Sequence, residues 1–357
     1  MSSEIAHAAD RRAFTAARNR LLTGLLAAGL LLLLAGAGAL LLGPSDVRVT
    51  PGEALAVLAS HLPGLAGLQA SPEAHAIVWE LRAPRLVAAA LIGMLLACAG
   101  VAFQGLLMNP LADPYTVGVS AGAAVGAAAA EAAGIAALAG GMAGTGAAFA
   151  AALLAVALVY LLASVGGRVS PHTFLLAGVV VGTFLWALIP LFLTLAGRSD
   201  ELTRLLHYLI GSVQSADWSR AGLLAPFAAV AVAALSVFAR DLNLVSLGEE
   251  TAAHLGVEME AFKRRTLLVG SLATAAAVSV GGIIGFVGLV VPHVARRIVG
   301  PDHRAVVPVA LLLGAALMLA SDTLVRVWLD EMPVGVVTSI VGAPVFCALI
   351  RRGAASW

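Results

Sequence analysis

The sequence predicts an all-α integral membrane protein in which ten transmembrane helices form a single domain, 1–357. Hydrophobic residues make up 61% of its 357 residues, charged residues make up only 11%, and the mean hydropathy is +0.99. Soluble domains carry about 25% charged residues, and a single soluble core stops growing at roughly 250–300 residues. Most of the surface must therefore face lipid. The net charge of +1 gives no indication of nucleic-acid binding.

The first predicted span is 21–42, an uncharged and mostly apolar run of 22 residues that follows Arg11, Arg12, Arg18 and Arg20. A secretory signal peptide has an apolar region of about 7–15 residues, whereas a helix needs about 20 residues to cross a bilayer. We therefore expect a retained first helix, preceded by a cytoplasmic tail, 1–20.

The remaining apolar stretches are 85–107, 115–133, 146–165, 173–196, 221–239, 266–299, 305–328 and 333–350. The stretch 266–299 is 34 residues long, about 50 Å as a helix, and one crossing requires about 30 Å. Its second half is interrupted by Gly281, Gly282, Gly285, Gly288 and Pro292. We therefore expect two short crossings with a break between them, which gives ten spans.

The distribution of basic residues supports this count. With ten spans and a cytoplasmic N-terminus, 14 of the 21 lysines and arginines fall on cytoplasmic segments and 7 fall outside. Cytoplasmic loops carry an excess of basic residues in membrane proteins. A single span over 266–299 would reverse the orientation of everything after it and weaken the bias. Both termini are therefore expected in the cytoplasm.

Small residues recur along the spans, as at Gly118, Gly122 and Gly126. In lipid, such rows let helix backbones approach closely. Packing within one bundle is the default interpretation, and a dimer interface is the alternative.

Two predicted outer segments have candidate roles. Arg82 and Arg85, in "ELRAPR" at 80–85, lie outside against the positive-inside trend. They are either interfacial anchors or a site for an acidic partner, because arginine pairs with carboxylates in a bidentate geometry. The second segment, 198–215, has an apolar stripe with helical spacing. It is either a simple interfacial helix or a gate over a central cavity. Its apolar residues are Leu202, Leu205, Leu206, Leu209 and Ile210.

The long inner loop, 240–265, is predicted to contain short helices. Ser246 and Glu249 have the spacing of a capping box, which would begin a short helix that ends at Gly256. A second short helix is expected from about Glu258. Two helices on the cytoplasmic face favour a docking surface for a soluble partner.

No energy source is evident in the chain. Its only lysine is Lys263, preceded by Phe262, so the phosphate-binding lysine of a Walker A motif is absent. Glu131 and Asp322 are the only carboxylates expected within spans, and neither has an obvious basic partner. An ion-coupled secondary transporter usually needs a chain of such groups, so this class remains only an alternative.

Enzymatic and metal sites are also weakly indicated. The residues GVSAG at 118–122 match the nucleophile-elbow pattern around Ser120, but the strand–turn–helix context is missing. An intramembrane serine hydrolase therefore stays a minor alternative. Cys98 and Cys347 each stand alone in apolar runs and are expected to be small buried side chains. The histidines show no metal-ligand spacing.

Five segments together resemble the permease family that imports iron-siderophores, haem and cobalamin. They are "LRAPR" at 81–85, "NPLADPYTVGVSAGAAVG" at 109–126, "LGEETAAHLGV" at 247–257, "GFVGLVVPHVARRIVGPDHR" at 285–304 and "MPVGVVTSIVGAPVFCALI" at 332–350. The resemblance covers nearly the whole chain beyond the first span. It implies a channel-forming subunit of an ABC importer in the bacterial inner membrane. Ten helices per subunit would form a homodimer around a central path, with two ATPase subunits below and a periplasmic binding protein above.

The resemblance also assigns roles to residues. It makes Arg82, Arg85 and Arg326 the outer arginines that receive acidic residues of the binding protein. It makes the inner loop the segment that couples to the ATPase, with Ser246, Leu247, Gly248, Glu249, Glu250, Leu255 and Gly256. The periplasmic gate and substrate path would include Leu202, Leu206, His207, Tyr208 and Leu209.

Haem is the cargo that the gate segment favours, followed by a ferric siderophore and then cobalamin. Histidine and tyrosine are ligands of haem iron, and His207, Tyr208 and His254 lie on the implicated segments. Arg198 and Arg204 would meet propionates. An ordinary amphipathic surface explains these residues equally well. We expect no cofactor on this chain, with ATP and Mg²⁺ on the partner ATPase.

Overall fold

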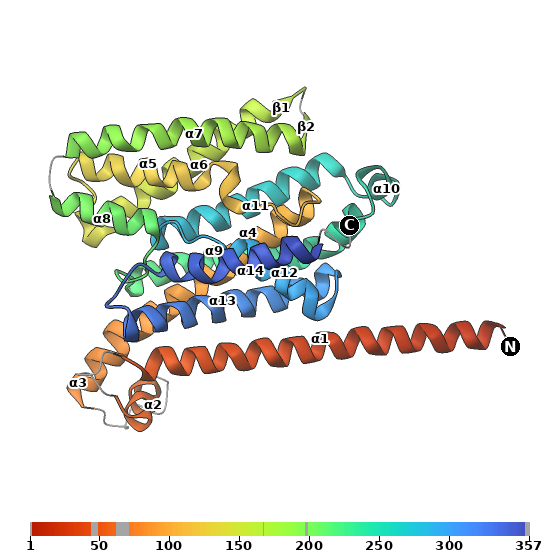
Figure 1. Ribbon diagram of the computed structural model, residues 1–357, viewed down its shortest axis with the longest axis horizontal. Helices are drawn as coiled ribbons and strands as arrows, with labels where there is room; N and C mark the ends of the chain where they lie inside the picture. Colours follow the sequence, from red (N-terminus) through yellow and green to blue (C-terminus); the bar gives the residue numbers. More distant parts are fainter. Residues whose placement is uncertain (1, 44–48, 62–70, 167, 197–198, 354–357) are drawn as a thin grey trace.

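Helices dominate the computed structural model, which describes residues 2–43, 49–61, 71–166, 168–196 and 199–353. Ten of the helices in this part of the chain lie lengthwise in one bundle (Figure 1). They are α1 (Ser2–Leu41), α4 (Ala83–Leu106), α5 (Val119–Ala132), α6 (Met142–Ala163), α7 (Pro171–Ala196), α9 (Trp218–Val245), α11 (Met259–Gly281), α12 (Val287–Val299), α13 (His303–Trp328) and α14 (Val334–Gly353). The predicted all-α membrane fold is confirmed.

Among the described residues, six helical segments are long and apolar enough to cross a membrane: Thr15–Leu41, Pro72–Leu106, Leu138–Ala163, Pro171–Thr194, Trp218–Val245 and His303–Trp328. Val119–Ala132 and Val334–Ala348 are shorter apolar helices. The two remaining helices of the bundle, α11 and α12, are less typical of membrane spans. Helix α11 carries charges in its first turns, and α12 has only 13 residues. A shorter span is possible where the surrounding chain provides the remaining backbone partners.

The shorter elements gather mainly at the two ends of the bundle (Figure 1). We name these ends after their most prominent helices. The α8 end carries α2 (Pro51–Ser60), α3 (Pro72–His75), the π-helix η1 (Ala76–Arg82), the 3₁₀ turn η3 (Leu138–Gly141) and α8 (Ser199–Ile210). The α10 end carries the hairpin of β1 (Ser164–Val165) and β2 (Arg168–Val169), together with α10 (Glu249–His254). Helix α1 begins, and α14 ends, toward the α10 end.

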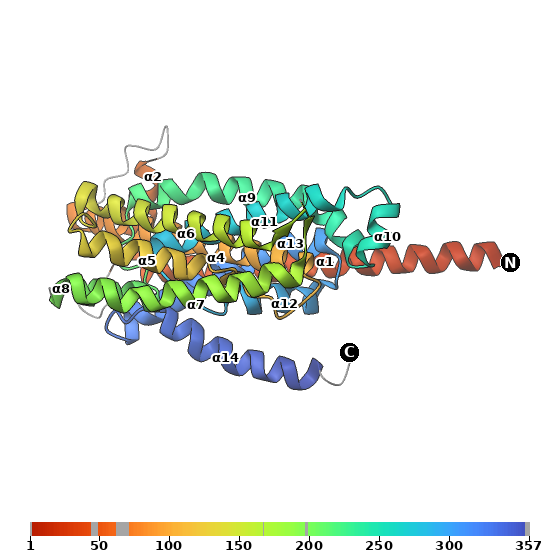
Figure 2. The same ribbon diagram turned by 90° about the horizontal axis from the view of Figure 1, so that it is seen from above.

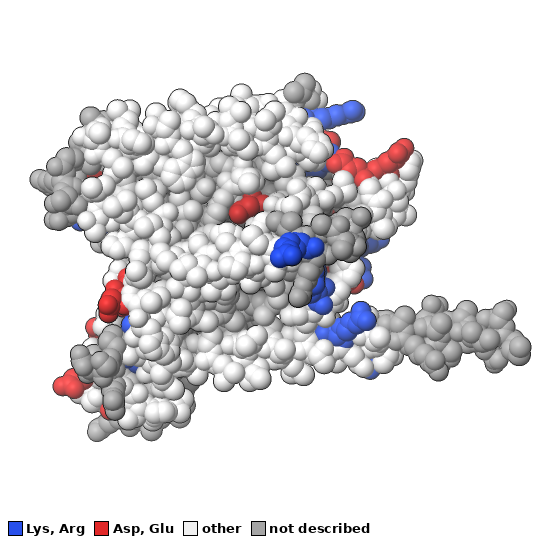
Figure 3. Space-filling view, viewed as in Figure 1, with Lys and Arg blue, Asp and Glu red and all other residues white. Residues whose placement is uncertain are grey.

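Charged side chains in the view of Figure 3 lie mostly toward these two ends, with a largely uncharged surface between them. Leucines of α1, α6 and α7 are exposed on the long sides of the bundle, for example Leu33 at 73%, Leu154 at 70% and Leu176 at 66%. Exposed apolar area of this kind is expected where the solvent is lipid.

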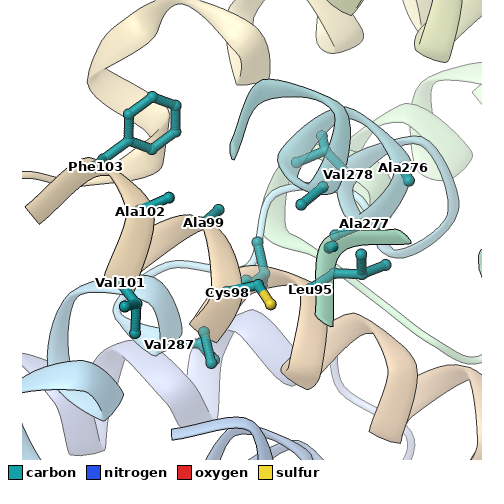
Figure 4. Close-up of a cluster of buried hydrophobic side chains, with 14 of the residues drawn as sticks. Leu95, Cys98, Ala99, Val101, Ala102, Phe103, Ala276, Ala277, Val278 and Val287 are labelled. Atoms are coloured by element: carbon teal, nitrogen blue, oxygen red, sulfur yellow. The ribbon is translucent and has the colours of Figure 1, made fainter. Parts of the chain in front are cut away.

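Helix α4 is the centre of the bundle and packs against α9, α11, α12 and α13. Its residues Leu95, Cys98 and Phe103 are fully or nearly fully buried, in the same hydrophobic cluster as Val278 of α11 and Val287 of α12 (Figure 4). Because most of this helix is enclosed by other helices of the same chain, α4 makes little contact with the surroundings of the bundle.

Glycines permit the closest helix contacts. A Cβ atom at Gly93 of α4 would overlap the carbonyl oxygen of Gly314 on α13, and one at Gly100 would overlap that of Gly288 on α12. In the predicted row, Gly122 and Gly126 pack against alanines of α6 in the same chain. That row therefore serves packing within one bundle, as in the default interpretation.

The predicted break in 266–299 lies between α11 and α12, at residues 282–286. Gly282 and Phe286 both have left-handed backbone angles, with φ of 67° and 68°. The Tyr115 hydroxyl, from η2 (Pro114–Val117), donates to the carbonyl of Ile284 at 2.9 Å and accepts from its N–H at 3.1 Å. Backbone groups released by the break thus find partners inside the bundle, which membrane-embedded backbone requires.

Candidate functional site

Helix α8 is amphipathic, as its sequence predicts, but its apolar residues serve two faces. Leu205 is buried at 3% exposure, whereas Leu202, Leu206 and Ile210 are 44%, 47% and 42% exposed. Only part of the apolar stripe packs against the rest of this chain. Three apolar side chains at the α8 end therefore remain uncovered by this chain.

A cavity of about 630 Å³ lies behind α8. Its walls come from the end of α5, the segment 136–145, α8, residues 212–220 and Ser279 and Val280 of α11. Ligand pockets commonly occupy about 300–1,000 Å³. Its polar lining includes Glu131, Arg204, His207, Tyr208, Gln214 and Arg220.

An ion pair holds α8 to the end of α5. Arg204 donates from Nε to Glu131 Oε1 at 3.2 Å and from Nη2 to Oε2 at 3.1 Å, a bidentate arrangement. The expectation that Glu131 has no basic partner is therefore wrong, because α8 folds back over a helix 73 residues earlier in the chain. Arg220 on the same cavity wall donates to the carbonyls of Ser215 and Gly140.

Two of the predicted gate residues, His207 and Tyr208, line the cavity, and Leu205, which the gate prediction omitted, lies beside them. The Tyr208 hydroxyl is buried and has no hydrogen-bond partner in the structure. A buried polar group without a partner is costly, so this hydroxyl is a candidate contact for a bound molecule or water. Leu202 and Leu206 lie on the opposite, exposed face of α8.

The end of α8 is joined by its backbone to two other elements. The N–H of Ile283, in the α11–α12 break, donates to the Tyr208 carbonyl at 3.1 Å. The N–H of Gly335, in the first turn of α14, donates to the carbonyl of Gly211 at 3.1 Å. Gly211 has a φ of 88° and a Cβ there would meet the Ile283 carbonyl. A displacement of α8 must therefore involve the break and the start of α14.

The three predicted docking arginines lie together at the α8 end, but this chain covers them. Arg82, Arg85 and Arg326 are only 5%, 9% and 7% exposed. Arg82 donates to the carbonyls of Leu40 and Leu41 at the end of α1, at 2.7 and 3.1 Å. Arg326 donates to the neighbouring carbonyl of Ala39.

Arg85 forms the charged centre of this group. Its Nε lies 2.9 Å from Asp322 Oδ1 on α13, and its Nη1 lies 2.8 Å from Glu331 Oε2 in the α13–α14 turn. The expectation that Asp322 has no basic partner is therefore also wrong. Asp330 and Glu331 in that turn have left-handed φ angles of 45° and 60°, which are unfavourable for residues other than glycine.

The inner loop forms a short helix, but the predicted capping box is wrong. Ser246 lies at the end of α9 in helical conformation, and its hydroxyl donates to the Asn243 carbonyl at 2.6 Å. Gly248 is the N-cap of α10 instead, and Glu249 pairs with Lys263. The predicted second short helix is the first part of α11, which begins at Met259.

The surface around α10 is apolar and acidic. Leu247 and Leu255 are 63% and 54% exposed, and Glu250 is exposed between them. Gly256 has a φ of 91°, which turns the chain sharply after the helix. The two exposed leucines thus flank α10, one on each side of it.

Other candidate chemistry finds little support in the described residues. Within them, no group of three or more His, Cys, Asp or Glu side chains is placed to hold a metal ion. Ser120 is a buried residue of the helix α5, without a preceding strand. Cys98 is buried as expected, but Cys347 is exposed on α14, because α14 lies at an edge of the bundle (Figure 2).

Comparison with known proteins identifies the family of this chain. The profile of the FecCD transport family matches residues 25–352. This chain belongs to the FecCD transport family. It is therefore a multi-pass membrane permease of an ABC transport system, as the resemblance implied.

Named relatives of this FecCD permease differ in cargo. It is 43% identical over 280 residues to the uncharacterised ABC transporter permease YvrB of Bacillus subtilis, covering 77% of this chain and 79% of the relative. It is 43% identical to the cobalamin import permease BtuC of Halobacterium salinarum, covering 78% and 74%. It is 38% identical to the hemin transport permease HmuU of Yersinia pestis, covering 77% and 83%.

The fold of this FecCD permease also matches a solved ABC transporter. The match is to an inward-facing structure assigned to the metal-chelate type, with a TM-score of 0.79 and 27% identity. It covers 92% of this chain and 98% of the other. A second structure, PsaBC from Streptococcus pneumoniae in complex with Fab, has a TM-score of 0.53 at 16% identity and reflects the fold alone.

Proposed function

We propose that this permease imports an iron complex, with haem as the first candidate, by ATP-driven alternating access. The observation that carries the cargo proposal is the cavity behind α8, where Arg204, His207 and Tyr208 line one space. Histidine and tyrosine can ligate haem iron, and arginine can pair with propionates. Ferric siderophores and cobalamin are the other cargoes to be tested.

The proposal includes a second copy of this chain. The uncovered residues Leu202, Leu206 and Ile210 lie on α8, at the end that the proposed orientation places outside the lipid. An equivalent helix of a second copy would cover them. The translocation path would then run between the two copies, with both α8 helices as its outer gate.

The proposal also includes partners at each end. The α10 end would face the cytoplasm, because 14 of the 21 basic residues belong to the predicted inner segments. Two ATPase subunits would bind around α10 and its exposed Leu247 and Leu255. A periplasmic binding protein would dock at the α8 end near Arg82, Arg85 and Arg326, after the covering carbonyls and carboxylates have rearranged.

Ion-coupled transport and hydrolysis remain less favoured. The carboxylates Glu131 and Asp322 are both engaged in ion pairs with arginine. Ser120 is buried in a helix, away from the context that makes serine nucleophilic. Neither alternative explains the exposed α10 surface.

Uptake into proteoliposomes tests the proposal. The permease and its co-purifying ATPase would be offered haem, a ferric siderophore or cobalamin, each with its cognate binding protein. ATP-dependent accumulation of haem alone would establish both mechanism and cargo. Accumulation of another ligand would retain the importer and exclude haem. Uptake without ATP or a binding protein would contradict the importer mechanism.

A further inference from the structure

The only lysine of the chain occupies an unusual position near α10. Lys263, in the second turn of α11, is 7% exposed. Its Nζ lies 2.7 Å from Glu249 Oε2 on α10 and 3.6 Å from Glu260 Oε1 on its own helix. Burial makes an ion pair more sensitive to the loss of either partner. The exposed neighbours Arg264 and Arg265 have no such enclosure.

The aliphatic part of Lys263 lies where three other elements meet. It shares a small apolar niche with Leu106 and Leu107 at the end of α4, Val169 of β2, Pro171 and Phe174 of α7, and Leu267 of α11. A lysine stem commonly packs on apolar surface while its ammonium reaches a polar partner. The charge of Lys263 is therefore held by α10 and its stem by the start of α7.

Glu260 completes the connection. Its Oε2 accepts a hydrogen bond from the N–H of Val169 at 3.2 Å. Glu249, Lys263, Glu260 and Val169 thus form a continuous series of contacts from α10 to the β1–β2 hairpin. The hairpin leads directly into α7, the helix that precedes α8 in the chain.

We propose that Lys263 is a positioning residue that transmits movement of α10 to the β1–β2 hairpin and the start of α7. The inference rests on the proposed function, in which a partner ATPase displaces α10. The ammonium holds Glu249, and the packed stem and Glu260 hold the hairpin, so the two elements move together. Without the charge, α10 is held to α11 only by the remaining backbone and apolar contacts.

A distance measurement tests the connection without any partner. Spin labels would be placed at Thr251 of α10 and Arg168 of β2, both exposed, in a Cys347→Ser background. We expect one narrow distance distribution in the parent protein and at least a twofold broader one in Lys263→Met. Lys263→Arg should restore the narrow distribution. Arg264→Met is the matched control, because it removes an exposed charge from the next residue. Equal widths in all variants would overturn the proposal.

Transport measurements separate this inference from the proposed function. In the reconstituted complex, Lys263→Met should retain ATPase binding and basal hydrolysis but lose at least tenfold in cargo transported per ATP. Glu249→Gln should show the same loss in cargo transported per ATP if Lys263→Met folds poorly. Normal coupling in both variants would overturn the proposal. A parent protein without ATP-driven uptake would instead contradict the importer function, and the spin-label distances would still decide the connection.

Discussion

At the scale of the residue, the arginines at the α8 end combine a predicted position with an unpredicted environment. The sequence and its family resemblance indicated that Arg82, Arg85 and Arg326 belong together near the outer surface. Their partners were not predictable, because Asp322 is 237 residues from Arg85 and meets it only when α4 and α13 pack. Local sequence patterns contain no information about such a pair.

The unequal burial of the two carboxylates around Arg85 leads to a stability prediction. The Asp322 side chain is 2% exposed and that of Glu331 is 32% exposed. Asp322→Asn should destabilise the protein by about 3 kcal/mol, because it leaves a buried arginine without its main counter-charge. Glu331→Gln should cost about 1 kcal/mol or less.

Thermal unfolding of the purified variants in detergent would measure this difference. Equal losses for the two variants would contradict the prediction and show that the turn carboxylate neutralises Arg85 as much as Asp322 does. The comparison also guides docking experiments. A charge reversal at Arg85 would place a third carboxylate beside Asp322 and Glu331, so Glu331→Gln is the better probe of binding-protein docking.

At the scale of the element, helical periodicity and glycine content located elements correctly, whereas the capping-box pattern did not. The helical spacing of 202–210 identified α8, and the glycines of 281–288 identified the break between α11 and α12. The capping box failed because Ser246 is the C-cap of α9 and keeps a helical conformation. A serine and a glutamate at the right spacing cannot reveal whether the preceding helix has ended. The sequence also could not show which side chains of α8 line the cavity, because the other walls come from helices such as α5 and α9.

Close packing of α4 on α13 yields a prediction about helix assembly. Gly93→Ala places a Cβ against the carbonyl of Gly314, backbone that cannot move aside without separating the helices. We expect a loss of about 1–3 kcal/mol, the usual range for overpacking. Gly29→Ala on α1 is the control, because nothing lies within 4 Å of its new Cβ, and alanine favours a helix over glycine by about 1 kcal/mol.

Thermal stability in detergent would test this comparison. The measured quantity is the temperature at which heating removes the monodisperse peak in size-exclusion chromatography. The expected order of stability is Gly29→Ala, parent and then Gly93→Ala. A neutral result for Gly93→Ala would contradict the close packing of α4 on α13.

At the scale of the whole molecule, the two ends differ in what covers their surfaces. The long sides of the bundle expose leucines that lipid can cover, as at Leu154 of α6. The α8 end exposes Leu202, Leu206 and Ile210. The end of this helix is hydrogen-bonded to the α11–α12 break and to the start of α14. In the proposed orientation this end lies outside the lipid, where a protein partner would cover the stripe, and the same stripe of a second copy is the simplest such partner.

Disulfide trapping in native membranes would test that arrangement. In a Cys347→Ser background, Leu206→Cys should form a covalent dimer on mild oxidation, because equivalent α8 residues would face each other across the twofold axis. Leu154→Cys, 70% exposed on the lipid-facing side of α6, should crosslink at least tenfold more slowly. Crosslinking of Leu206→Cys should also change when the ATPase binds nucleotide, since the proposed gate moves in the transport cycle. Equal crosslinking at both positions would indicate random collision, and the α8 stripe would then require a partner other than a second copy.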